Sequence, residues 1–197
     1  GISEAFIQVA TYSKIPLPVD SKVIRTSMSI RLPVGEELLG KTVDVFNNPT
    51  NVSSTPNDIT DTVSLDILPK NISTRKKITQ PYYTGVAVVD VLLPLGKGQR
   101  ELIIGDTQTG KTSFLLQLCS FQVKMGSIVI YCCIGKSKSD IKSIEHYLDT
   151  YKLKDRAILY ISESTDPLIS IISAPLAAMS TAEWFCTHGY DVTLILD

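Results

Sequence analysis

From about residue 82 onward, short apolar runs alternate with segments whose apolar residues recur at helical spacing. The short runs are continuous rather than alternating, as is typical of strands that are covered on both faces. They predict four strands, at Leu102–Ile104, Ser127–Ile134, Ala157–Ile161 and Val192–Asp197.

The segments between these runs predict helices. Lys111–Lys124 places four apolar side chains on one face, and Gly126 follows where a helix commonly ends. Asp140–Tyr151 repeats the helical spacing. Because strands alternate with helices of this length, the sequence predicts parallel pairing through right-handed crossovers. We therefore expect an α/β domain with an open parallel sheet and helices on both faces.

A longer helix is expected after Asp166-Pro167. The aspartate is a suitable N-cap, and the proline suits the first helical position. Pro175 should interrupt and kink this helix, because proline lacks the N–H that the helix needs. The pair His188-Gly189 should end it.

Residues 1–80 follow a different pattern. Val23–Ile30 and Leu38–Phe46 are β-rich runs punctuated by turn residues, and Thr50–Asp61 is polar enough to predict a surface loop. The chain starts at Gly1 rather than Met and stops at the end of a strand-like run. We therefore expect it to be a piece of a longer protein.

The composition of the chain disfavours several classes of function. Of 197 residues, 44% are hydrophobic, and the net charge is −1. A nucleic-acid binder would need a basic excess for its phosphate contacts, so this class is disfavoured. The four cysteines lack C-x-x-C spacing, and three of them lie inside apolar runs, so we expect small buried hydrophobic residues rather than disulfides. Apolar runs fall short of the ~18 residues that indicate a membrane span, and no secretory signal peptide is visible.

The strongest chemical signal is a match to G-x-x-x-x-G-K-[ST], between a predicted strand and a predicted helix. Its residues are Gly105, Asp106, Thr107, Gln108, Thr109, Gly110, Lys111 and Thr112. Glycines let the backbone N–H groups turn inward toward phosphate oxygens, and the helix N-terminus adds its own donors. Lys111 supplies a charge for the terminal phosphates, and the Thr112 hydroxyl can ligate Mg²⁺.

Asp197 ends an apolar strand 85 residues after Thr112. This is the place of a Walker B carboxylate, which would hold Mg²⁺ through water opposite Thr112. The pattern therefore predicts a metal site made by Thr112 and Asp197.

Three stretches carry a family resemblance: Leu93–Thr112, Pro33–Asp44 and Glu183–Phe185. The first contains Gly-Lys-Gly-Gln-Arg-Glu-Leu-Ile-Ile-Gly-Asp, which resembles the approach to the phosphate loop in the alpha subunit of F-type ATP synthases. The second is similar to the segment where that family's N-terminal β-barrel passes into its nucleotide domain. The resemblance extends from about residue 21 to Asp197.

The resemblance implies a P-loop NTPase (RecA-like) fold. It places the end of a small β-barrel at residues 1–30 and the first part of the nucleotide-binding domain at 31–197, ending at the Walker B strand. It further implies bound ATP or ADP with Mg²⁺, beta-type catalytic partners and a central gamma-type shaft in a hetero-hexameric ring, and no nucleic acid. The complex would lie peripherally on an energy-transducing membrane and couple ATP synthesis or hydrolysis to ion transport.

In catalytic relatives, the strand after the phosphate loop ends in Gly-Glu, and the glutamate orients the attacking water. Here the matching pair is Gly135-Lys136, where the alpha family has glutamine at the second position. Lysine cannot replace a general base worth about 10²–10⁴-fold, so the resemblance implies a non-catalytic site. Thr107 also replaces an arginine of the family, and we hypothesise that Lys136 reaches a phosphate.

Two other functions stay open at this point. The first is an active ATPase or specialised rotary motor, with Glu163, rather than Glu145, as a substitute carboxylate. The second is a Rho-type RNA translocase, which shares a Gly-Gln-Arg lead-in to the loop. The absence of a basic or aromatic platform in residues 1–80 counts against the second.

Overall fold

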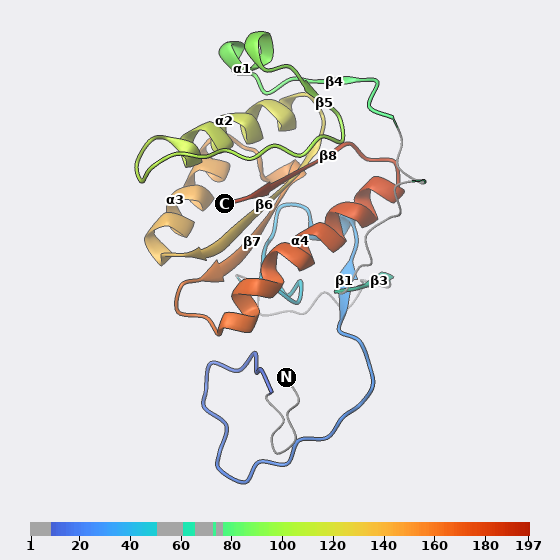
Figure 1. Ribbon diagram of the computed structural model, residues 1–197, viewed down its shortest axis with the longest axis vertical. Coiled ribbons are helices and arrows are strands. Elements are labelled where there is room, and N and C mark those ends of the chain that lie inside the picture. The colour runs from blue at the N-terminus through green and yellow to red at the C-terminus, as the bar shows by residue number, and fades with distance from the viewer. Residues whose placement is uncertain (1–8, 51–60, 66–72, 74–76) are drawn as a thin grey trace.

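The computed structural model describes residues 9–50, 61–65, 73 and 77–197. Its centre is a four-stranded parallel sheet with the order β2-β7-β6-β8 (Figure 1). The strands are β2 (Thr42–Val43), β6 (Ile128–Lys136), β7 (Ala157–Glu163) and β8 (Val192–Leu196). The predicted parallel α/β sheet is confirmed.

Helices cover both faces of this sheet, as predicted. Helices α2 (Lys111–Lys124) and α3 (Lys138–Thr150) pack on one face, and α4 (Leu168–Thr187) packs on the other (Figure 1). Side chains alternate between faces along a strand. In β6, Ile128, Ile130 and Cys132 therefore join the α4 core, while Val129, Tyr131 and Cys133 join the core under α2 and α3.

The ends of α2 and α3 follow from local sequence. Gly126, two residues after α2, has φ 92°, a left-handed conformation that glycine adopts without a steric penalty. The Ser137 hydroxyl caps α3 by accepting from the Asp140 N–H. The predicted extents of both helices are confirmed to within two residues.

The start of α4 differs from the prediction. The helix begins at Leu168 with Pro167 as its N-cap, and Asp166 is not the capping residue. The Asp166 carboxylate instead accepts from the Glu163 N–H at 2.8 Å, which closes the turn after β7. The helix also continues through Pro175 rather than dividing there, and it ends at His188-Gly189 as predicted.

By length and hydropathy, α4 meets the criterion for a membrane span, contrary to the expectation from the sequence. Half of the apolar window is buried within the protein, however, and the buried side is mostly small. Residues of this kind pack α4 closely on the sheet: Ala174, Ala177, Ala178 and Ala182. The hydropathy of α4 is therefore explained by its place in the core.

The remaining elements are short. They are β1 (Arg31–Val34), η1 (Glu36–Leu38), β3 (Asp61–Ser64), β4 (Pro81–Tyr82), α1 (Ala87–Leu92), β5 (Leu95–Gly96) and η3 (Lys154–Arg156). Two antiparallel pairs form among them, β1 with β3 and β4 with β5.

The first eighty residues depart furthest from the predicted pattern. Val23–Ile30 forms no strand and is exposed, because no described strand offers it a ladder of hydrogen bonds. Within Leu38–Phe46 only β2 is a strand, and it pairs with β7 of the main sheet. The predicted loop falls largely on residues 51–60, which lie outside the described residues. The domain division at residue 30 stays a prediction.

Candidate functional site

The glycine-rich loop at 105–110 leads directly into α2 and lies on the surface. Lys111 is the first helical residue, and Gly110 caps the helix with φ 91°. Residues 101–110 are all exposed. The first turn of α2 therefore presents its free N–H groups and its positive dipole end to solvent, as an anion site requires.

The first glycine of the loop lies close to the side chain of Thr109. A Cβ on Gly105 would lie 2.7 Å from the Thr109 Oγ1, closer than real side chains allow. That hydroxyl is held in turn by donating to the Asp106 carbonyl at 2.8 Å. Gln108 has φ 64°, so the chain reverses sharply between Asp106 and Gly110. The loop is thus a tight cradle that an alanine at position 105 would fill.

Lys111 turns back over this cradle. Its ammonium donates to the carbonyl oxygens of Gly105 at 2.7 Å and Asp106 at 2.5 Å. The ammonium is therefore held beside the loop by exposed hydrogen bonds to neutral carbonyls. A charged anion can replace these carbonyls at small cost, because it is a stronger acceptor.

The strand predicted before the loop is absent. Leu102, Ile103 and Ile104 are 77%, 38% and 84% exposed and have no strand conformation. Among the described strands none pairs with this run, and β8 is hydrogen-bonded to β6 alone. An apolar run becomes a strand only when a neighbour supplies hydrogen bonds and a covering layer.

Asp197 lies beside the first turn of α2. The Thr112 hydroxyl donates to its Oδ2 at 3.2 Å, although the two residues are 85 positions apart. The Asp197 backbone is fixed by β6, since its N–H donates to Cys132 O at 2.9 Å and its carbonyl accepts from Ile134 N at 2.8 Å. The structure therefore brings together the two residues predicted to share a metal.

Two further side chains meet the Asp197 carboxylate, and the sequence did not predict either contact. The Tyr131 hydroxyl donates to Oδ2 at 2.5 Å, and the Lys136 ammonium lies 3.0 Å from Oδ1. Burial, together with this hydrogen bond, raises the pKa of Tyr131, so the phenol remains a donor at neutral pH. Tyr131 could have been found from its alternation with Val129 and Cys133 on the α2 face.

Oxygen donors at this point suit a hard divalent cation. Mg²⁺ is commonly held by one or two protein oxygens while phosphates and water complete its octahedron. Thr112 and Asp197 supply that share. Among the residues that the structure describes, no cluster of three or more His, Cys, Asp or Glu could hold a metal by itself. The donor set therefore fits a metal that arrives with a phosphate ligand.

The cysteines and the alternative carboxylates have other surroundings. Burial raises the pKa of both Cys119 and Cys133 to about 12, which keeps these thiols protonated. The Glu163 carboxylate lies 3.6 Å from the Lys138 ammonium and accepts from Thr165. Glu145 accepts from the Thr42 hydroxyl at 2.9 Å. Within the described part of the chain, neither glutamate is hydrogen-bonded to Thr112 or Asp197.

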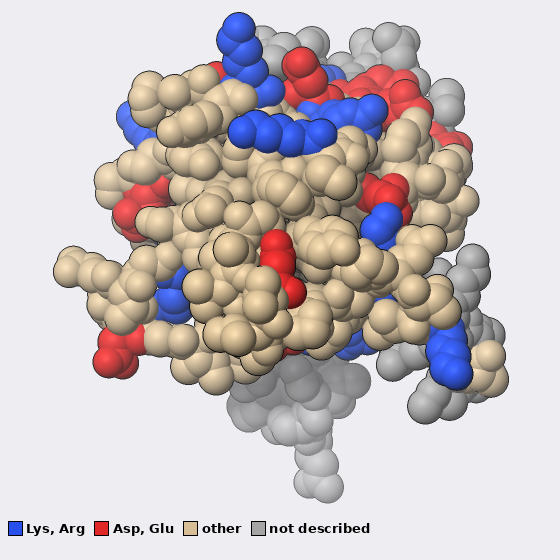
Figure 2. All heavy atoms as spheres, turned by 90° about the horizontal axis from the view of Figure 1, so that it is seen from above, with Lys and Arg blue, Asp and Glu red and all other residues tan. Residues whose placement is uncertain are grey.

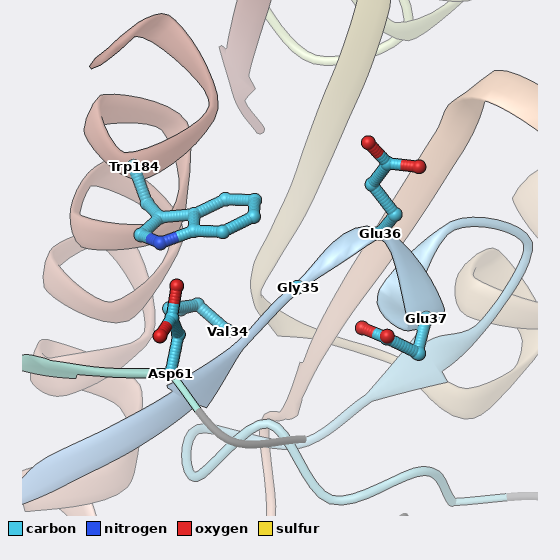
Figure 3. A pocket seen from close by; sticks show the side chains of 6 residues that line it. All are labelled: Val34, Gly35, Glu36, Glu37, Asp61 and Trp184. Atoms are coloured by element: carbon cyan, nitrogen blue, oxygen red, sulfur yellow. The ribbon is translucent and has the colours of Figure 1, made fainter. Parts of the chain in front are cut away.

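A hollow of about 200 Å³ lies elsewhere, between η1, β3 and α4 (Figure 3). Trp184 and the carboxylates of Glu36, Glu37 and Asp61 line it, and no residue of the 105–112 loop does. Three carboxylates would repel a triphosphate. We therefore place the candidate site at the loop and Asp197, and not in this hollow.

Comparison with known proteins gives a consistent picture. Residues 85–197 match the family described as "ATP synthase alpha/beta family, nucleotide-binding domain". ATP synthase subunit alpha 1 of Pseudoalteromonas atlantica is 33% identical over 195 residues, which are 97% of this chain and 36% of that protein. ATP synthase subunit alpha 2 of Hahella chejuensis is 34% identical over 176 residues, 89% of this chain and 34% of that protein.

A third relative, ATP synthase subunit alpha of Teredinibacter turnerae, is 34% identical over 172 residues, 87% of this chain and 33% of that protein. The chain thus spans about a third of the length of the curated relatives it matches.

Proposed function

Because the chain belongs to the ATP synthase alpha/beta family through its nucleotide-binding domain, we propose that it holds Mg-ATP in an alpha-type subunit of a rotary F-type ATP synthase. The observation that carries this proposal is the meeting of Thr112, from the loop, with Asp197, from the end of β8. Hydrogen-bond donors for phosphate oxygens and a carboxylate meet there at one edge of a parallel sheet, where α/β proteins commonly bind ligands.

The loop residues divide the work of holding the phosphates. The backbone N–H groups from Gly105 to Thr112 and the α2 dipole receive the phosphate oxygens. Lys111 exchanges its two loop carbonyls for the terminal phosphates, which are far stronger acceptors. ADP uses the same groups, with fewer contacts to Lys111.

Thr112 and Asp197 are the residues that would hold Mg²⁺. When bound, the ion neutralises charge on the phosphates and fixes their orientation. The Thr112 hydroxyl, now donated to Asp197, supplies an oxygen ligand, and the Asp197 carboxylate supplies charge directly or through water.

The proposed site holds nucleotide without turning it over. The residue at the end of β6 is Lys136, whose ammonium is bonded to Asp197 and has no lone pair to accept a proton from water. Losing a general base costs about 10²–10⁴-fold in rate. The catalytic step would then belong to neighbouring beta-type subunits, around a gamma-type shaft, in a complex peripheral to an energy-transducing membrane.

Nucleotide affinity of the full chain tests the binding proposal. Lys111→Ala should weaken ATP binding about 10- to 100-fold, because a charge-assisted contact of roughly 1.5–3 kcal/mol is lost. Lys124→Ala is the matched control, since Lys124 lies at the other end of α2 and is exposed. Equal affinities for both variants by isothermal titration calorimetry would contradict the proposal.

Turnover of the assembled ring tests the non-catalytic role. Lys111→Ala in this chain alone should leave the chemical step in place. Complete loss of that step, with assembly intact by size-exclusion chromatography, would contradict the role.

A further inference from the structure

Lys136 and Asp197 form a partly buried ion pair where two neighbouring parallel strands end. Lys136 is the last residue of β6, and Asp197 follows β8 directly. Their charged atoms are 3.0 Å apart, and their side chains are 19% and 13% exposed. By contrast, the pair Lys97–Asp191 is 42% and 64% exposed. Salt screens a covered pair much less than an exposed one.

The backbones on both sides of the ion pair are fixed. Asp197 is hydrogen-bonded through both its N–H and its carbonyl to β6. The carbonyl of Lys136 accepts from the Ser164 N–H at 3.0 Å. The sheet therefore fixes the backbone of both residues. When the ion pair forms, the main conformational freedom lost is that of the Lys136 side chain.

An irregularity at the end of β6 accompanies the turn of Lys136 toward Asp197. Simple alternation would place Lys136 on the α4 face with Ile130 and Cys132. Pairing with β7 shifts register between Cys133 and Lys136, and Gly135 has φ 62°. Bulges of this kind re-aim side chains at the ends of strands. The ammonium consequently meets a carboxylate that is also bonded to Tyr131 and Thr112.

Both oxygens of Asp197 already have donors. Oδ1 has the Lys136 ammonium, and Oδ2 has the hydroxyls of Tyr131 and Thr112. A divalent cation that approaches this carboxylate must share it with a fixed positive charge. Without a divalent cation, that same positive charge remains beside the carboxylate that contacts Thr112.

We propose that Lys136 is a tethered counter-ion of Asp197 that reduces the contribution of Mg²⁺ to nucleotide binding by this chain. The proposal rests on the nucleotide-binding function proposed above. Lys136 acts in two ways that reinforce each other. It repels Mg²⁺ from Asp197, which lowers the gain from the ion, and it supplies part of the same neutralising charge when the ion is removed.

The test is the ratio of ATP dissociation constants measured in EDTA and in saturating Mg²⁺, by calorimetry on the full chain. The native chain should show a ratio below about threefold. Lys136→Gln removes the charge and should raise the ratio to about tenfold or more, equivalent to at least about 1.4 kcal/mol. Lys136→Arg keeps the charge and should stay close to the native ratio.

Lys138→Gln is the matched control. Lys138 is two residues away, 73% exposed, and pairs with Glu163 rather than Asp197. Its substitution removes the same charge from the same segment and should leave the ratio unchanged. Binding of Mn²⁺-ATP, followed by electron paramagnetic resonance, gives a second readout: Lys136→Gln should bind the Mn²⁺ ion more tightly than the native chain.

The outcomes separate this inference from the function on which it rests. A native ratio well above about threefold, or one that Lys136→Gln does not raise, would contradict the counter-ion role alone. Equal ratios for Lys136→Gln and Lys138→Gln would also contradict it. Failure of ATP to bind in either medium would contradict the proposed function, and this inference with it.

Discussion

Residues 111–197 and residues 85–110 are comparably apolar, yet only the first group buries its apolar side chains. In the first group, β6, β7 and β8 run through two cores, and Phe185, Ile130 and Tyr160 are fully buried. In the second, six apolar residues in α1, directly after it or in the run before the loop are at least 66% exposed: Val88, Val91, Leu92, Leu93, Leu102 and Ile104. Figure 2 looks down on the side where α1 lies, and uncharged side chains cover most of it.

The difference shows that an apolar run forms a buried strand or helix only where a neighbouring element packs against it. Each strand of the sheet has at least one hydrogen-bonded neighbour, and helices cover both faces of the sheet. The run at 102–104 has neither among the described elements, so it stays exposed beside the loop. The loop at 105–110 nevertheless keeps its shape, because hydrogen bonds from Thr109 and Lys111 hold it locally.

The largest expected effect comes from the core. Phe185→Ala should lower the free energy of unfolding by about 3–5 kcal/mol, because a fully buried ring is replaced by a cavity. Ile104→Ala should change it by less than about 0.5 kcal/mol, as for an exposed site. Urea unfolding measures both. A cost above about 2 kcal/mol for Ile104→Ala would mean that the two regions are packed alike.

A buried polar cluster sharpens the same contrast. Asn47 is fully buried, donates to Pro33 O at 2.7 Å and accepts from the Tyr160 hydroxyl at 2.5 Å. Asn47→Ala should cost about 1–3 kcal/mol, because these groups lose a partner. Its φ of 63° adds strain for alanine, so Asn47→Gly should be less harmful in the same unfolding assay. Equal stability of Asn47→Ala and the native chain would contradict this.

The smallest expected effect lies in the turn before α1, where Thr84 and Gly85 contact Asp90. Asp90 accepts from the N–H and hydroxyl of Thr84, both at 2.7 Å, and from the Gly85 N–H. These bonds, led by the Thr84 hydroxyl, hold the pKa of Asp90 below its usual value of about 3.9. Because the folded pKa is lowered, the stabilisation is present above about pH 4 and is lost as the pH falls through the folded pKa.

An NMR titration of the Asp90 carboxyl carbon reports this directly. Its midpoint should lie below that of a model peptide, and Thr84→Val should bring it back toward the peptide value. A midpoint at or above the peptide value would show that the turn before α1 is not ordered by this carboxylate.

Much of the packed region could be predicted from the sequence. The extent of α2, the three strands of the sheet that follow it and the meeting of Thr112 with Asp197 follow from periodicity and from one motif. The resemblance to alpha subunits is confirmed by the matched family and relatives. These features depend on local spacing and on the rule that the carboxyl ends of parallel strands share an edge.

Other features depend on partners that a linear pattern does not specify. The strands expected at 23–30 and 102–104 do not form, because no described strand pairs with either run. Asp166 closes a turn instead of capping α4, because the Glu163 N–H competes for its carboxylate. The bond from Lys136 to Asp197 accompanies a register shift near the end of β6, which alternation alone would miss.

Amide hydrogen exchange with and without Mg-ATP tests most directly whether the exposed loop and Asp197 act as one nucleotide site. Nucleotide should slow exchange across residues 105–112 and at Asp197, while the exposed segment 23–30 stays unchanged. Slower exchange confined to other regions, or none at all at saturating Mg-ATP, would contradict the account.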